Sequence, residues 1–248
     1  MTSRATRTEW LLFATLGFAW GSSYLWIKIG VETLPPFTLI AARLVIAALL
    51  LGVVLRLTGL TLPRDRRVYG HLLVMAIVNI ALPFFLIAWG EQSIDSALAS
   101  ILNSTVPLFT IVLAALALHD EAITVNRLVG LVLGFGGVVL LTSRNLAGAG
   151  DSSLWGELAI VGSSISYAAG AVYARRNVRG LSPMIPAFFQ VFFALVITGS
   201  LALLLERPWA LSLAPDAGAA ILWLGLLGSG LAYPIFFRLL RSWGPTRT

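Results

Sequence analysis

The sequence predicts an all-α integral membrane protein whose transmembrane helices form two inverted repeats. Three observations support this fold class. Of the 248 residues, 58% are hydrophobic and only 11% are charged, whereas a soluble domain carries roughly 25% charged residues. The apolar residues gather in eight runs, each long enough to cross a bilayer. Finally, polar and aromatic landmarks of the first half of the chain recur in the same order in the second half.

The eight apolar runs are separated by turn residues, of which the pair Pro35-Pro36 is one example. A helix needs about 20 residues to cross a ~30 Å hydrocarbon core. The first nine residues are polar, and no small-residue cleavage site closes the run that follows, so we interpret that run as a retained span and not as a signal peptide. The expected spans lie near residues 10–30, 36–56, 70–90, 96–118, 127–144, 155–175, 184–206 and 218–240.

The arginines predict which loops face the cytoplasm. Thirteen of them lie in the N-terminal segment, in the loops after spans 2, 4 and 6, and in the segment after span 8, whereas the other loops hold only Arg144 and Arg207. Positive residues collect on the cytoplasmic side of membrane proteins. We therefore expect a cytoplasmic N-terminus. The net charge of +6 then reflects topology, and no nucleic-acid partner is expected.

The two halves of the chain are related by nearly constant shifts. A shift of 149 residues aligns LPFFLIAWGEQS with LAYPIFFRLLRS. The repeat unit holds five spans, and since five is odd, the second copy must enter the membrane from the opposite face. Such inverted repeats are typical of secondary transporters with a substrate site near the midplane; the alternative is that apolar helices align by chance. A shift of 147 residues pairs Trp20 with Tyr167, Lys28 with Arg175, Pro36 with Pro183, and Arg43 with Gln190.

Two stretches of the chain are similar to a known family. AWGSSYLWIK with LPPFTLIAARLVIAALLL in the first two spans, and SALASILNSTVPLFTIVLAALALHDEAIT with VNRLVGLVLGFGGVVLL in spans 4 and 5, resemble the EamA-like branch of the drug/metabolite transporter superfamily. The resemblance covers essentially the whole chain. It implies an inner-membrane exporter of small metabolites, amino acids or toxic compounds, built from ten helices in two five-helix repeats with both termini in the cytoplasm.

The chain departs from this family pattern because it supplies eight spans and not ten. The expected domains are a first repeat of five transmembrane helices over residues 1–146 and an incomplete second repeat of three over residues 152–248. We therefore expect a C-terminally truncated form of a carrier of roughly 295 residues, in which about 45 residues with spans 9 and 10 are absent.

Two asparagine–proline pairs lie within the expected spans. Pro83 follows Asn79 by four residues, and Pro107 follows Asn103 by the same interval. Proline lacks the N–H that would bond the carbonyl four residues earlier, so each pair offers an amide side chain and a freed backbone carbonyl at one depth. Lipid cannot satisfy these groups. Two interpretations stay open: a pair of polar clamps for substrate, or kinks satisfied by Ser or Thr on a neighbouring helix.

Aromatic and polar residues of the first span are further candidates for a site between the halves. Trp20 lies at its centre and is followed by Ser23 and Tyr24, while Tyr167 is the repeat counterpart of Trp20. Close helix packing is the alternative role for this small, polar stretch. The expected substrate-binding residues are Trp20, Ser23, Tyr24, Asn79, Asn103, Tyr167 and Tyr233.

Charged residues in or near the spans are expected to act in structure or gating. Lys28 either extends to the outer interface or pairs with Glu91 or Glu32. Arg43 lies deeper in span 2, and its partner is either Glu91 or a substrate carboxylate. The resemblance favours a structural or gating role, since the family carries a basic residue there across many substrate types; it also matches Glu121 to the acidic residue that closes the fourth helix. The expected structural or gating residues are Lys28, Arg43, Glu91, Pro83, Pro107 and Glu121.

The chain carries no enzyme motif such as HExxH, GxSxG or a Walker loop. It has no cysteine and only two histidines, so we expect neither enzymatic activity nor a metal or other cofactor. The predicted function is a secondary transporter that exports small molecules across the inner membrane by alternating access. A lipid or drug flippase of the same fold and a non-transporting membrane fragment or scaffold are the alternatives. The expected partners are a small-molecule substrate, the lipid bilayer and, through the glycines of span 5, a second copy of the chain.

Overall fold

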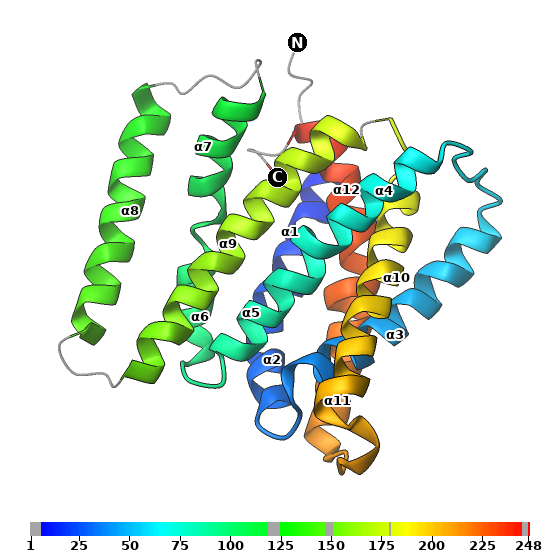
Figure 1. The fold of residues 1–248 in the computed structure, drawn as a ribbon. Coiled ribbons are helices and arrows are strands. Elements are labelled where there is room, and N and C mark those ends of the chain that lie inside the picture. Colours follow the sequence, from blue (N-terminus) through cyan, green and yellow to red (C-terminus); the bar gives the residue numbers. More distant parts are fainter. Residues whose placement is uncertain (1–5, 119–124, 147–150, 179, 245–247) are drawn as a thin grey trace.

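The computed structural model describes residues 6–118, 125–146, 151–178, 180–244 and 248, which form helices and turns without any strand (Figure 1). Six of the described helical segments are long and apolar enough to cross a membrane. Together they identify an all-α, multi-pass integral membrane protein, as the composition predicts. The six segments are Arg7–Val31, Pro36–Leu57, Arg66–Gly90, Ser96–Ala117, Met184–Glu206 and Pro215–Trp243.

Helices lie at all five expected spans of the first half. Pro36 occupies the first turn of the second span, where its missing N–H costs nothing, and Gly59 follows the end of that span with a φ of 59°, a conformation that favours glycine at a helix end. The elements are α1 (Arg7–Gly21) and α2 (Ser23–Val31), α3 (Pro36–Leu57), α4 (Arg66–Ala76), η1 (Ile77–Ala81) and α5 (Leu82–Gly90), α6 (Ser96–Asn103) and α7 (Val106–Ala117), and α8 (Val125–Leu146).

Helices also lie at the three expected spans of the second half. The helix α9 has 27 residues, a length of about 40 Å at 1.5 Å per residue, although its polar stretch GSSISY keeps it outside the six most apolar segments. The elements are α9 (Asp151–Asn177), α10 (Met184–Leu201) and η2 (Ala202–Glu206), then η3 (Pro208–Ala210), α11 (Pro215–Trp223), η4 (Leu224–Leu231) and α12 (Ala232–Trp243).

Two π-helical segments occupy equivalent places in the two halves. A shift of 149 residues moves η1 onto residues 226–230, which lie inside η4. Each segment precedes a proline, Pro83 or Pro234, whose missing N–H interrupts the α-helical ladder. Short π-helical turns are rare and occur mostly as local bulges in helices. Their matched positions support the interpretation of an internal repeat.

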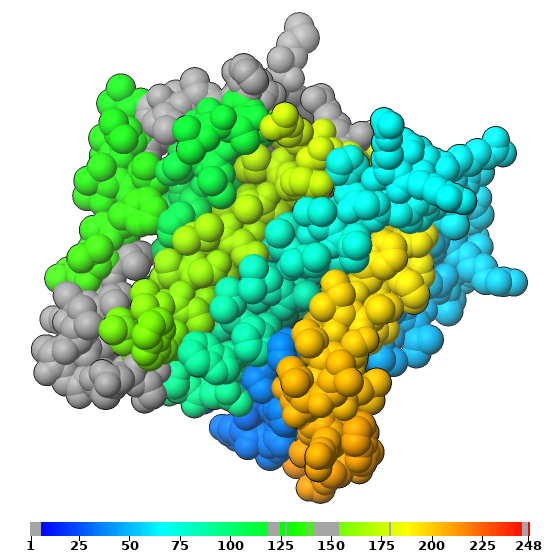
Figure 2. Space-filling view, viewed as in Figure 1, coloured from blue at the N-terminus to red at the C-terminus, as the bar shows by residue number. Residues whose placement is uncertain are grey.

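Helices of the first half pack against helices of the second half throughout the bundle. The helix α3 contacts α10 and η4, α9 contacts α5 and α7, and α1 contacts α12. Figure 2 shows α9, the α4–α5 rod and α10 side by side on one face. Outward-facing leucines such as Leu116 and Leu204 are 80% and 77% exposed, as expected of side chains that face lipid tails.

The first turn of α1 and the last turn of α12 lie at the same end of the bundle. The ring centroids of Trp10 and Trp243 are 5.3 Å apart. An even number of membrane crossings requires this arrangement. Which side of the membrane it faces stays a prediction that depends on the arginine distribution.

Candidate functional site

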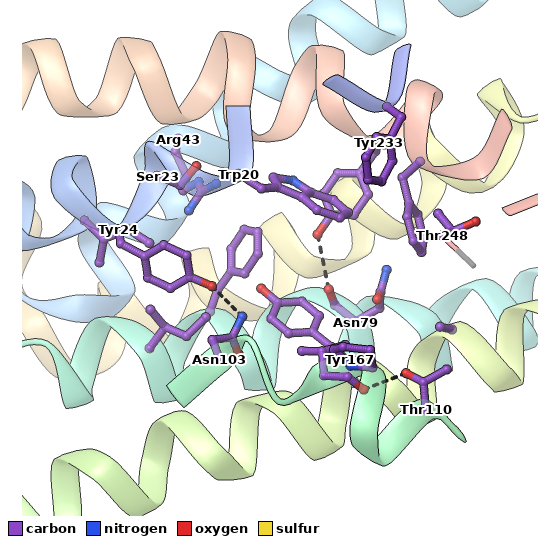
Figure 3. Close-up of a pocket in the computed structure, with 18 residues that line it drawn as sticks. Trp20, Ser23, Tyr24, Arg43, Asn79, Asn103, Thr110, Tyr167, Tyr233 and Thr248 are labelled. Atoms are coloured by element: carbon purple, nitrogen blue, oxygen red, sulfur yellow. Dashed lines mark hydrogen bonds between the residues drawn. The ribbon is translucent and has the colours of Figure 1, made fainter. Parts of the chain in front are cut away.

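A cavity of about 430 Å³ lies between the two halves of the bundle (Figure 3). Its walls come from α1, α2, α3, η1, α5, α6 and α7 of the first half and from α9 and α12 of the second. All seven residues that were expected to bind substrate line this one cavity: Trp20, Ser23, Tyr24, Asn79, Asn103, Tyr167 and Tyr233. The seven residues therefore share one cavity, whereas substrate contact by them stays a prediction.

The backbone carbonyl that Pro83 frees is satisfied by the other half of the chain. The Tyr233 hydroxyl donates a hydrogen bond to the Asn79 carbonyl oxygen at 3.2 Å. The Asn79 side chain also crosses between the halves, since its Nδ2 donates to the Gln190 side-chain oxygen at 3.1 Å. The widened turn of η1 therefore places two polar groups of one residue against α10 and α12.

Asn103 connects three helices at the opposite end of the cavity. Its Nδ2 donates to the Tyr24 hydroxyl, and its Oδ1 accepts hydrogen bonds from Ser163 Oγ and Ser164 Oγ, both at 2.9 Å. The break between α6 and α7 falls just before Pro107. Serines on a neighbouring helix thus bond the side chain of this asparagine and not the carbonyl that Pro107 frees. Because Asn103 also lines the cavity, both interpretations of this asparagine–proline pair stay open.

The small, polar WGSS stretch at the junction of α1 and α2 packs against η4 and α11. Trp20 Nε1 donates to the Gly228 carbonyl oxygen at 3.2 Å, and Trp223 Nε1 donates to Ser22 Oγ at 3.1 Å. The Ser23 hydroxyl bonds a carbonyl of its own helix. Trp20 also contacts the ring of Tyr233, with centroids 6.2 Å apart. Figure 3 shows Tyr167 across the cavity from Trp20.

Lys28 is bonded to backbone carbonyls. Its Nζ donates to the carbonyl oxygens of Glu91 and Ile94, at 2.6 and 3.0 Å. A cation at these carbonyls is favoured because the last carbonyls of a helix lack intrahelical partners and carry partial negative charge. Lys28 therefore bonds Glu91, one of its expected partners, but through the backbone carbonyl and not through the carboxylate. Neither Glu91 carboxylate oxygen has a hydrogen-bond partner in the described part of the chain.

Glu91 is fully buried one residue beyond the third span. Burial raises the pKa of its carboxyl to about 9 from an ordinary 4.5, while the Lys28 charge acts in the opposite direction. Between these pH values the folded protein holds a proton that the unfolded chain has released. The free energy of unfolding should therefore fall as the pH rises from about 5 to about 9.

The Glu91→Gln variant is expected to lose this pH dependence of stability, because its amide cannot ionise. Unfolding temperatures of the purified protein across this pH interval provide the measurement. Glu32→Gln is the matched control, since Glu32 lies at the same end of α2 and is exposed; it should keep the wild-type slope. Parallel curves for wild type and Glu91→Gln would show that Glu91 does not carry the effect.

Arg43 faces the cavity and not the outer end of the third span. It is only 3% exposed, and its guanidinium carbon lies 4.2 Å from the centroid of the Phe84 ring. The expected alternative pairing with Glu91 is wrong within the described residues, because neither carboxylate oxygen of Glu91 has a partner. Pro107 also lines the cavity. Glu121, the remaining expected gating residue, lies outside the described residues.

Sequence reasoning missed several lining residues, among them Phe13, Phe84, Thr110, Ala171 and Phe236. Most are apolar and lie within uniformly apolar runs, so no contrast with their neighbours marks them. Within the described ranges, no group of three or more His, Cys, Asp or Glu side chains is arranged to hold a metal ion.

Comparisons with known proteins agree with this architecture. The model of the EamA-like transporter family matches residues 8–143 and 154–248. The "Uncharacterized inner membrane transporter YedA" of Escherichia coli K12 is 32% identical over 238 residues, which cover 94% of this chain and 74% of the relative. The "Uncharacterized transporter YoaV" of Bacillus subtilis is 22% identical over 90% of this chain and 76% of its own length.

A plant relative and a solved structure extend the comparison. The "WAT1-related protein At3g02690, chloroplastic" of Arabidopsis thaliana is 27% identical over 94% of this chain and 57% of its own length. A chain of known crystal structure has the same fold, with a TM-score of 0.72 at 19% identity over 96% of this chain and 80% of that one.

Proposed function

Because the chain belongs to the EamA-like transporter family, we propose that it is a secondary transporter that exports small metabolites, amino acids or toxic compounds across the inner membrane by alternating access. The observation that supports this function most is the cavity between the two halves, to which both contribute polar side chains. A site at the interface of two repeats is the arrangement from which rocking of one repeat against the other exposes a substrate alternately to the two sides.

The contacts between the halves suggest where such a movement takes place. Tyr233 and Gln190 bond the two polar groups of Asn79, and the Glu206 carboxylate accepts the backbone N–H groups of Phe37 and Thr38 at 2.9 and 2.6 Å. The second contact satisfies the free donors at the start of α3. Directional hydrogen bonds of this kind can exchange partners when one repeat moves against the other. The lining combines amides and a guanidinium with aromatic rings, which favours a small amphipathic substrate over a lipid.

The proposed function predicts that filling the cavity stops transport. Ala171 lines the cavity and is 8% exposed, so an Ala171→Phe side chain occupies space that the substrate requires. Cells that overexpress the protein are preloaded with a defined mixture of the standard amino acids and small organic acids and amines, and mass spectrometry quantifies their release. We expect the wild type to accelerate the release of at least one compound and Ala171→Phe to lower that release to background.

Ile165→Phe is the matched control, since it adds a ring on the same helix at a position that is 43% exposed; it should transport as the wild type does. Unfolding temperatures of both variants are measured as well: a wild-type value for Ala171→Phe indicates a blocked cavity, and a much lower value indicates a misfolded protein. Release that is indifferent to Ala171→Phe, or a wild type that accelerates the release of no compound, would contradict the proposal.

A further inference from the structure

The geometry points to a substrate class: small organic anions whose carboxylate is bound by the guanidinium of Arg43 while an apolar body lies against the aromatic walls. This inference rests on the proposed transport function and specifies the chemistry of the same cavity. Its basis is a buried cation within a membrane span that has no partner of opposite charge among the described residues.

Arg43 is a buried donor without an acceptor in the described part of the chain. It is 3% exposed and lines the cavity, and Figure 3 shows it beside Ser23 and Trp20. The described residues give its guanidinium no hydrogen bond, and the buried Nε is among the unpartnered atoms. A guanidinium carries five N–H donors. Native proteins bond most buried polar groups, so this guanidinium requires an acceptor that the described part of the chain does not supply.

No acidic side chain of the described lining neutralises this charge. Arg43 is the one charged side chain among the lining residues in the described ranges. The other titratable side chains of the described lining are the phenols of Tyr24, Tyr167 and Tyr233, and phenols are neutral near pH 7. Glu91, the other partner that the sequence suggested, is not bonded to it. An unpaired charge in a membrane interior is costly and marks a functional site by default.

The ring of Phe84 supports the cation without consuming its donors. A guanidinium 4.2 Å from a ring centroid gains a cation–π contact that is worth about 0.5–2 kcal/mol. This contact is made with the π face of the ring and uses none of the N–H groups as a hydrogen-bond donor to an oxygen. Carboxylates and phosphates accept two parallel N–H bonds from this fork, and the carboxylate is the smaller of the two. One guanidinium therefore accommodates one anionic group, and we assign a carboxylate to it.

The guanidinium is held in place by a close approach of η4. A Cβ atom at Gly228 would lie 3.0 Å from both Arg43 Nη2 and Ser23 Oγ, so a larger residue at this position would displace the guanidinium. Gly225, which precedes Gly228 in η4, lies equally close to the backbone of Arg43. A Cβ atom at Gly225 would lie 2.9 Å from the Arg43 carbonyl oxygen. The guanidinium thus contacts both η4 at Gly228 and the Phe84 ring, and a side chain held in this way is pre-organised for a ligand, which lowers the entropic cost of binding.

The rest of the lining determines the body of the ligand. Trp20, Tyr24, Phe84, Tyr233 and Phe236 supply aromatic faces and edges to the cavity. A volume of about 430 Å³ lies in the range of small-molecule pockets and is too small for a phospholipid with two acyl chains. The repeat counterpart of Arg43 is Gln190, whose oxygen is already bonded to Asn79.

The test uses three probes that share one body and differ in the charge of the head: 3-phenylpropanoate, 3-phenylpropanamide and 3-phenylpropylamine. Calorimetric titration of the purified protein in lipid nanodiscs measures their affinities, and proteoliposomes measure their transport. We expect the carboxylate to bind the wild type at least about tenfold more tightly than the amide or the amine, since charge-assisted hydrogen bonds contribute about 1.5–3 kcal/mol and 1.4 kcal/mol is a factor of ten.

Two variants of Arg43 assign the preference to this side chain. Arg43→Gln, which copies the residue of the second half, should lower the affinity for the carboxylate to that for the amide. Arg43→Lys keeps the charge but not the planar fork, and should retain part of the preference. Arg56→Gln makes the same change on the same helix at an exposed position outside the cavity, and should bind all three probes as the wild type does.

The outcomes separate the substrate class from the transport function. Equal or tighter binding of the amide or the amine by the wild type overturns the anion inference, as does unchanged carboxylate binding by Arg43→Gln or binding of none of the probes. If the amide or the amine is transported and Ala171→Phe blocks it, the transport function stands while the anion class falls. If the metabolite mixture also shows no release that depends on the cavity, the transport function falls with it.

Discussion

Gly225→Leu is expected to lower the free energy of unfolding by about 3 kcal/mol, which is the upper part of the range for overpacked interiors. A Cβ at Gly225 would lie 2.8 Å from Ile46 Cβ and 2.9 Å from the Arg43 carbonyl oxygen. The carbonyl oxygen is part of the α3 backbone, and the Cβ atom is attached directly to it. Rotating a side chain therefore cannot relieve the contact. The helix α3 must move away from η4, and the apolar contacts between these two elements are lost with it.

Gly218→Leu is the matched control within the same apolar segment, Pro215–Trp243. A Cβ at Gly218 would meet only Leu213 Cδ2, at 3.9 Å, which is an ordinary contact. Because leucine is also the better helix former, this variant should be as stable as the wild type or slightly more so. Thermal unfolding in detergent, followed by size-exclusion chromatography, compares the two. Equal melting temperatures would show that α3 and η4 do not approach as closely as the structure has them.

The positions of the helices could be predicted from the sequence because the membrane imposes a minimum apolar length on each span. Helices lie at all eight expected spans, and the punctuating prolines and glycines account for their ends. The spans themselves are less regular than a hydropathy pattern implies. The helix is interrupted between α1 and α2 and between α6 and α7, and it widens into π-helical turns at η1 and η4. Proline marks the last three places, but it does not determine which irregularity results.

The cavity residues could be predicted where a polar group interrupts an apolar run, as at Asn79 and Asn103. Their partners could not, because the pairings join residues that are far apart in the chain: Tyr233 is 154 residues from the carbonyl that it bonds. Lys28 shows a second limit, since its acceptors are backbone carbonyls, and these occur at every residue and leave no sequence signal. The sequence predicts Arg43 as a charge within a span, whereas only the arrangement of its neighbours shows that it has no partner among the described residues.

Asn103→Leu is expected to abolish transport and to lower the free energy of unfolding by about 1–2 kcal/mol, the range for hydrogen bonds between membrane helices. Leucine has a similar volume but leaves the Tyr24 hydroxyl without its donor. Ser163 and Ser164 keep a second acceptor, the Ile160 carbonyl oxygen, at 2.7 and 3.2 Å, and this limits the loss. Unfolding temperature and metabolite release are measured on the same preparations.

The two measurements separate a direct role in substrate binding from a structural one. The amide of Asn103 has two acceptor sites on its oxygen, both used by the serines, and two N–H donors, of which Tyr24 takes one. One N–H therefore remains for a ligand in the cavity. Tyr24→Phe removes the hydroxyl but leaves the asparagine, so it should cost less stability than Asn103→Leu and retain part of the transport.

Combining Tyr24→Phe with Asn103→Leu should add little to the destabilisation of Asn103→Leu alone, because the hydrogen bond that both changes remove is the same one. Full additivity of the two effects would show that the bond between Tyr24 and Asn103 contributes nothing to stability. Lost transport in Asn103→Leu with an unchanged unfolding temperature would instead assign this side chain to the substrate alone. The α6–α7 break would then be held by the helix packing around it and not by the asparagine.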